Sequence, residues 1–226
     1  FDRNEPHAQI PAGRDVSPIT RTFVAFGQRS VPYLIPLLDD GDADIRYYAT
    51  VLASEFVHPD LVQPIGRRLF DPQLIERLRA SARDGRKLQP QVTSIEALGR
   101  LRDADSFEFF VSLLESPEVA VIRAAHASLV RLSCQDFGTH KKKWTAWFDK
   151  HNPQHRVEWL IAGLMHTDER LRRRASDELK HLTQEYFGYD PGASKKEREA
   201  AQQKYRVWWQ RVGFRMFVRT EPNGSG

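Results

Sequence analysis

Apolar side chains recur along this chain at intervals of three and four residues, which is the spacing of amphipathic helices. In the clearest stretch, Ile122, Ala125, Leu129 and Leu132 fall on one helical face. No segment alternates apolar and polar residues over six or more positions, as a half-buried strand would. Glycines and prolines occur mostly singly, which is typical of short helices joined by tight turns. We therefore predict an all-α protein with ten or eleven helices and essentially no strand.

Capping residues mark several of the predicted helix starts and ends. Ser17, Asp71 and Ser116 each precede a proline, the arrangement of an N-cap followed by proline at the first helical position. Ser194 and Glu197 have the spacing of a capping box, which would start the last long helix. Three helices are predicted to end at Gly27, Gly138 and Gly188.

The apolar pattern repeats itself after 50 residues. The matched pairs include Phe107 with Val157, Phe110 with Leu160, Leu114 with Leu164, Val121 with Leu171, Ala125 with Ala175, and Leu129 with Leu179. After an insertion of 11 residues, the aromatic stretch 143–148 matches 204–209 at an offset of 61. A looser copy of the first helices lies at an offset of 76. The predicted unit is a helical pair followed by an aromatic third helix, which is typical of helical-repeat proteins.

The two aromatic helices allow two interpretations. They could anchor a peptide, because Trp and Tyr dominate interface hot spots. They could instead cover the edge of the preceding repeat. Because the same cluster occurs in two repeats, we favour the packing interpretation.

Three segments resemble the HEAT repeats of the armadillo/HEAT superfamily. Residues 27–38 are similar to the turn into a first helix, and 42–46 to the acidic turn and hydrophobic–arginine pair that opens a second helix. Residues 97–101 are similar to a second-helix end. The resemblance covers about residues 18–185 and departs from the family at 71–91 and in the aromatic helices. It implies a right-handed α-α superhelix, in which stacked helical pairs bury one continuous core.

The resemblance also sets the expected domain boundaries. We expect one HEAT-like solenoid domain over residues 1–219, capped by the helix from Ser194 to Arg211, and a disordered tail at 220–226. The four repeats are expected at 17–57, 60–102 (irregular), 105–151 and 154–215.

Charge is distributed unevenly along the 226 residues. The net charge is +4, but residues 139–226 carry 18 Lys and Arg against 11 Asp and Glu, and the first 138 residues carry 16 against 19. The basic clusters contain Lys141, Lys142 and Lys143, then Arg170, Arg172, Arg173 and Arg174, and finally Lys195, Lys196 and Arg198. Such clusters can form a solvated face, complement an acidic protein or follow nucleic-acid phosphates. The sequence leaves these three interpretations open.

No catalytic or metal-binding motif stands out. Cys134 is the single cysteine, which excludes a disulfide framework and a cysteine zinc site. His151 and His155 are four residues apart, but Asn152 and Pro153 break the helical register between them. The acidic pairs fall at helix starts, where carboxylates cap amides. We therefore expect no metal, no cofactor and no enzyme activity.

The second helices of such a solenoid line a concave surface that binds macromolecules. We therefore expect a non-catalytic protein–protein interaction or scaffold module of a larger protein or assembly. Its partner is expected to be another protein, which could present an acidic surface. The expected partner-binding residues are Arg46, Tyr47, Arg123, His126, Arg173 and Lys180.

Two alternatives come from other classes that use HEAT-like repeats. Nucleic-acid binding through the basic C-terminal half is the first, as in HEAT-like DNA-repair glycosylases, although none of their catalytic carboxylates can be matched here. A bilin-lyase-type enzyme is less favoured, because no motif for a chromophore pocket occurs.

Three features of the sequence bear on compartment and membrane attachment. No apolar run approaches the ~20 residues of a membrane span. The chain starts at Phe1, so we expect a fragment or processed form whose targeting signals are out of view. The single cysteine is compatible with a cytoplasmic location.

Overall fold

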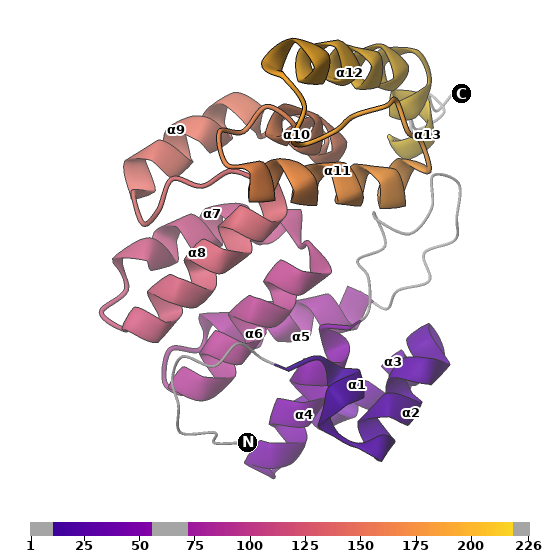
Figure 1. The fold of residues 1–226 in the computed structure, drawn as a ribbon. Coiled ribbons are helices and arrows are strands. Elements are labelled where there is room, and N and C mark those ends of the chain that lie inside the picture. The colour runs from indigo at the N-terminus through magenta and orange to yellow at the C-terminus, as the bar shows by residue number, and fades with distance from the viewer. Residues whose placement is uncertain (1–10, 56–71, 219–226) are drawn as a thin grey trace, which may run out of the picture. The chain divides into compact units, whose positions relative to one another are not determined.

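The computed structural model describes residues 11–55 and 72–218. Every regular element in these two ranges is helical and none is a strand, which confirms the predicted all-α class (Figure 1). The chain divides into two compact units. The described part of the first unit comprises 11–55, 72–132 and 137–146, and that of the second comprises 133–136 and 147–218.

The first unit consists of short helices joined by tight turns. Its α-helices are α1 (Gly13–Val16), α2 (Pro18–Phe26), α3 (Val31–Leu34), α4 (Ala43–Ala53), α5 (Pro72–Arg83), α6 (Leu88–Leu101), α7 (Phe107–Ser112), α8 (Val119–Ser133) and the first half of α9 (Lys141–His151). Turns of 3-10 helix at Gly27–Ser30, Pro36–Asp39, Ala104–Ser106 and Leu113–Glu115 separate several of them.

The core of the first unit is built from the inward faces of these helices. The fully buried side chains include Leu34, Leu74, Leu78, Ile95, Leu98, Leu101, Phe107, Phe110 and Leu129. Helices α6 and α8 approach closely at Gly99, where an added Cβ would lie 2.2 Å from the Ser128 Oγ. Ser128 Oγ donates to the Ile95 carbonyl, 3.1 Å away. The small residue therefore permits the contact between these two helices.

A buried carboxylate ties α5 to the turn that follows α6. Asp103 is fully buried and accepts hydrogen bonds from Arg79 Nε at 2.8 Å and from Ser106 Oγ at 2.6 Å. Arg79 Nη2 also contacts both Asp103 and Asp105. These hydrogen bonds raise the pKa of the Arg79 guanidinium above its ordinary value, so the guanidinium remains protonated.

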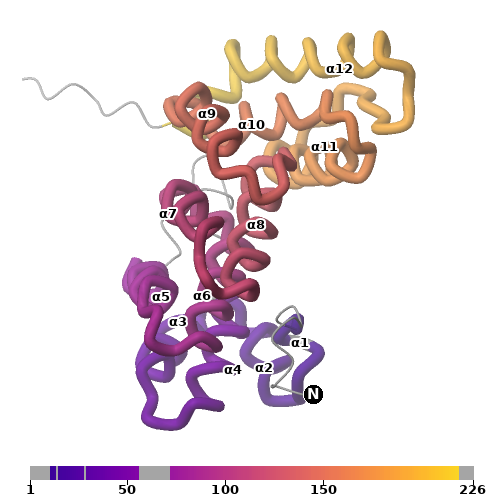
Figure 2. The backbone as a smooth tube through the Cα atoms, turned by 90° about the vertical axis from the view of Figure 1, so that its left-hand side faces the viewer, coloured from indigo at the N-terminus to yellow at the C-terminus, as the bar shows by residue number. Residues whose placement is uncertain are grey.

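The second unit contains the second half of α9 and the three helices that follow it. They are α10 (Arg156–Gly163), α11 (Glu169–Thr183) and α12 (Lys195–Trp208), and α12 continues through a five-residue π turn (Trp209–Gly213) into α13 (Phe214–Phe217). Figures 1 and 2 show α10 between α11 and α12, and α10 contacts both. The core contains Cys134, Leu160, Leu164, Ala175, Leu179, Tyr189, Tyr205 and Trp208. Cys134 is fully buried, as expected of a cysteine that packs as a small apolar side chain.

The predicted helix starts at Ser17 and Ser194 agree with the structure, whereas the start predicted at Ser116 is two residues too early, because α8 begins at Val119. Ser17 accepts from the Thr20 amide at 3.1 Å, and Ser194 and Glu197 form the predicted capping box. The predicted ends at Gly138 and Gly188 are wrong, because α8 and α11 end earlier, at Ser133 and Thr183. In both cases a residue other than glycine takes the left-handed conformation that stops the helix: Cys134 at φ 52° and Gln184 at φ 55°. The two glycines take positive φ later, in the following loops.

The solenoid superhelix, the single domain over 1–219 and the repeats at 17–57, 60–102, 105–151 and 154–215 remain predictions. Part of the irregular second repeat, the cap at Asp71 and the tail at 220–226 lie outside the described residues.

Candidate functional site

Two arginines hold equivalent positions at the starts of α4 and α11. Asp42 caps α4 and Asp168 caps α11, and an arginine follows each cap after four residues. Arg46 Nη1 donates to the carbonyls of Asp40 and Gly41. Arg172 Nη1 donates in the same way to the carbonyls of His166 and Thr167, at 2.9 and 2.8 Å. Each arginine therefore satisfies the two carbonyls that precede its own helix cap.

Arg172 is further enclosed by the loop that follows α11. Its Nε donates to the Pro191 carbonyl at 2.9 Å, and only 7% of the residue is exposed. Although Arg172 belongs to the predicted basic cluster, its guanidinium holds two loops together and adds little to the surface charge. Arg46, a predicted partner-binding residue, is half-buried in its own turn.

A second arginine of the second unit, Arg156, is also buried. Arg156, at the start of α10, pairs with Glu178 of α11 at 2.8 Å, and 7% and 14% of the two side chains are exposed. Because removing one partner of a buried pair leaves an uncompensated charge, this contact fixes α10 against α11.

The remaining arginines of α11 point outward and form what we call the arginine face: Arg170, Arg173 and Arg174. Arg170 is 91% exposed and pairs with Asp168 at 2.9 Å. Arg173 pairs with Glu169 at 2.8 Å across one helical turn. Hydrogen bonds from Arg170 hold the pKa of the Asp168 carboxyl below its ordinary value, so the cap stays ionised at neutral pH. The face therefore displays guanidinium groups that are oriented by local carboxylates.

An aromatic ring extends this face. Lys180 Nζ lies over the ring of Tyr186, 4.7 Å from its centroid, and Tyr186 is 62% exposed. Lys180 follows Arg173 by seven residues, so the two share one side of α11. Arg173 and Lys180 were expected from the sequence, whereas Tyr186, which lies outside the helix, was not. The short spacing between Lys180 and Tyr186 is the only signal that could have indicated it.

The other predicted residues lie in the first unit. Tyr47 of α4 is half-buried, with its ring edge-on to Tyr48 at 5.3 Å between centroids. On α8, Arg123 is exposed, and His126 is half-buried beside Trp144. The structure thus brings together Arg173 and Lys180 on α11 and places the other four on α4 and α8.

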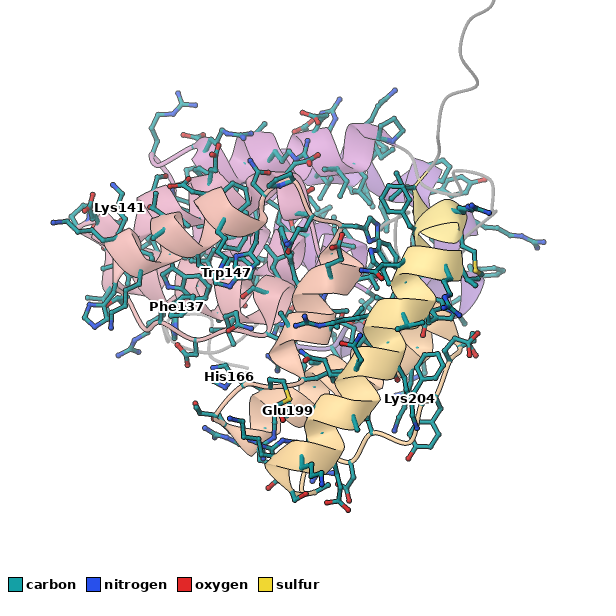
Figure 3. The ribbon with its side chains drawn as sticks, turned by 90° about the horizontal axis from the view of Figure 1, so that it is seen from above. Phe137, Lys141, Trp147, His166, Glu199 and Lys204 are labelled. Atoms are coloured by element: carbon teal, nitrogen blue, oxygen red, sulfur yellow. The ribbon has the colours of Figure 1, made fainter. Side chains whose placement is uncertain are left out.

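The lysine cluster occupies the first turn of α9. Lys141 pairs with Glu115 at 2.6 Å, whereas Lys142 and Lys143 are exposed. Figure 3 labels Lys141 at this end of the helix. The first turn of α9 contains no acidic residue, so three cations stand at the positive end of the helix dipole.

The aromatic helices support the packing interpretation. Trp144 is fully buried, contacts Phe107 and Phe137 edge-on, and donates from Nε1 to the Gly138 carbonyl at 2.7 Å. Its counterpart Tyr205 is also fully buried. These rings are therefore core components and cannot anchor a peptide at the surface.

The described residues include no group of three or more His, Cys, Asp or Glu side chains placed to hold a metal ion. Among the helices that the structure describes, none is both long and apolar enough to cross a bilayer. No model of a known protein family matches the chain, and no curated protein matches it significantly.

Proposed function

We propose that this chain is a protein-interaction module that binds an acidic segment of a partner protein through the arginine face and Tyr186. The observation that carries the proposal is a difference in burial among the arginines of α10 and α11. Two of them, Arg156 and Arg172, are buried and make contacts that hold the fold together. The other three, Arg170, Arg173 and Arg174, are exposed. Arginine and tyrosine are, with tryptophan, the residue types enriched at interface hot spots.

The local charge balance favours a protein over a nucleic acid at this face. Residues 168–181 carry five Lys and Arg and four Asp and Glu. A face that tracks phosphates gains from a strong net positive charge, whereas this one presents both signs. Mixed charges fix the register of a protein partner and exclude wrong ones by like-charge repulsion.

The exposed ion pairs contribute little to folding. Pairs such as Arg170–Asp168 and Arg173–Glu169 are typically worth about 0–1 kcal/mol in the free protein. A partner carboxylate can therefore replace the local one at small cost. Because guanidinium groups bind carboxylates in a bidentate way, the exchange supplies directional contacts.

A nuclear magnetic resonance titration with a short Glu-rich peptide tests the proposal on the full chain. Amide shifts should change along 170–181 and at Tyr186. The double variant Arg173→Glu/Arg174→Glu should abolish them, while Lys195→Glu/Lys196→Glu, which alters the net charge equally, should retain them. Shifts that are absent, or that survive the first double variant, would exclude this face.

Nucleic-acid binding is a second candidate, and the lysine cluster of α9 favours it. Lys142 and Lys143 are exposed at a helix end where cations are electrostatically unfavourable, so an anionic ligand would relieve their repulsion. Fluorescence anisotropy with duplex DNA between about 50 and 200 mM salt tests this candidate. Micromolar binding that falls steeply with salt, and that Lys142→Glu/Lys143→Glu removes, would support it. The absence of binding at the lowest salt would eliminate it.

A further inference from the structure

The last helix that the structure describes, α12 with its continuation into α13, has one side packed in the core and one side exposed to solvent. From Ala201 to Gly213, its buried residues are Ala201, Gln202, Tyr205, Trp208, Trp209 and Gly213. Gln202 Nε2 donates to the Ile161 carbonyl at 2.8 Å, which fastens α12 to α10. The orientation of the helix is therefore set, and with it the identity of the residues on the outer side.

The π turn joins α12 to α13 without a break in the helix. A Cβ on Gly213 would lie 2.6 Å from the Trp208 ring and 2.8 Å from the Trp209 ring, so both indoles pack directly against the backbone there. The π turn inserts one extra residue relative to an α-helical turn, and the helix continues past the two indoles without ending. The outer side consequently continues from α12 into α13.

Cations and apolar side chains alternate on that outer side. We define the outer stripe as Arg206, Val207, Arg211, Phe214 and Arg215. Val207, Arg211 and Phe214 follow one another at helical spacings of four and three, and Arg206 and Arg215 directly adjoin Val207 and Phe214. The three arginines are exposed, Phe214 is 42% exposed, and neighbouring Val212 is 46% exposed. In Figure 3, α12 is the yellow helix that bears the labels Glu199 and Lys204.

The stripe carries charge of one sign only. No Asp or Glu occurs between Glu199 and Val218. The described residues offer none of the three arginines an ion pair, in contrast to Arg170 and Arg173 on α11. The outer stripe and the arginine face thus differ in chemistry: the first combines unneutralised cations with exposed apolar groups, and the second combines cations with carboxylates.

We propose that the outer stripe binds the surface of an anionic lipid bilayer. Lipid phosphates and carboxylates pair with the guanidinium groups, while Phe214 and Val212 enter the boundary between headgroups and acyl chains. A nucleic acid would use the arginines but leave the apolar side chains in water. A bilayer surface, which is anionic outside and apolar beneath, interacts favourably with both components. The attachment is peripheral and needs no membrane span.

Vesicle co-sedimentation with the full chain tests this proposal. The probes are phosphatidylcholine vesicles with and without about 30% phosphatidylserine, at about 50 and 200 mM salt. Binding is expected only with phosphatidylserine and should weaken at the higher salt. Each arginine beside an anionic surface strengthens binding about fivefold, so Arg211→Glu/Arg215→Glu should weaken it at least about 25-fold.

Matched variants separate this surface from general electrostatics and from misfolding. Lys195→Glu/Lys196→Glu changes the net charge equally at the opposite end of α12 and should weaken binding less than about threefold. Phe214→Ser should remove most of the binding that persists at the higher salt. Because Phe214 also touches Trp209, a melting curve accompanies this variant. The arginine variants alter no packed side chain and keep the test valid if Phe214→Ser unfolds.

Three outcomes would overturn the proposal. The first is no binding to phosphatidylserine vesicles at the lower salt, or equal binding to pure phosphatidylcholine. The second is an equal loss in the Lys195→Glu/Lys196→Glu control. The third is duplex DNA that displaces the vesicles and binds equally well to Phe214→Ser, which would make the stripe a nucleic-acid surface.

Discussion

Arg172 Nε donates a hydrogen bond to the Pro191 carbonyl, 2.9 Å away, and thereby joins the start of α11 to the loop that leads into α12. Two further bonds, to His166 and Thr167, complete the set. We expect Arg172→Met to lower the free energy of unfolding by about 3 kcal/mol, because it leaves carbonyls without donors in a buried setting. Urea denaturation measures the change.

The matched control for this variant is Arg174→Met, an exposed neighbour on the same helix. It should change stability by less than about 0.5 kcal/mol. Equal effects of the two variants would show that Arg172 has no special structural role.

Close packing of α6 on α8 depends on Gly99. We expect Gly99→Ala to destabilise the protein by about 1–3 kcal/mol, because the new methyl group would overlap Ser128. The double variant Gly99→Ala/Ser128→Gly should recover part of the loss, since it removes both the Oγ and the Cβ from the overlap. Gly41, which has open space around it, serves as the control: Gly41→Ala should be close to neutral. A neutral Gly99→Ala would contradict the close approach of the helices.

The lysines at the start of α9 should lower the free energy of unfolding. Lys142→Glu/Lys143→Glu places anions at the positive end of the helix dipole and is expected to stabilise the protein by about 1 kcal/mol. Lys150 lies in the last turn of the same helix, so Lys150→Glu should have the opposite sign. Thermal melts at low salt test both. Destabilisation by the double variant would mean that the two lysines make favourable contacts in the folded chain.

The Tyr205 hydroxyl should lose its proton at a higher pH than the hydroxyl of an exposed tyrosine. Burial raises its pKa from the ordinary 10.0 to about 12. An unfolded Tyr205 loses its proton near pH 10 while the folded one keeps it, so stability declines as pH rises from about 10 to about 12. The loss is at most about 3 kcal/mol. Tyr205→Phe should flatten this part of the stability curve, and an unchanged curve would contradict the burial of the hydroxyl.

The sequence predicts the helical class and several caps because these depend on local spacing. Of the residues predicted to share one helical face, Ala125, Leu129 and Leu132 are fully buried and Ile122 is half-buried. The errors at helix ends have a local cause: Cys134 and Gln184 adopt a positive φ that propensity assigns to glycine.

The candidate site was only partly predictable. Arg172, Arg173 and Arg174 form one basic run in the sequence, yet successive residues of a helix point about 100° apart. Arg172 turns inward under a loop that packs over it, and the position of that loop depends on tertiary contacts. Tyr186 was missed for the same reason.

The most direct test of the central claim, binding of an acidic partner by the arginine face, is quantitative affinity capture. The full chain is immobilised and exposed to nuclease-treated extract of its native host, and retained proteins are compared among variants by mass spectrometry. We predict a partner that binds the wild type and Lys195→Glu/Lys196→Glu but is lost with Arg173→Glu/Arg174→Glu. The claim would be contradicted by partners that are retained equally by all three forms.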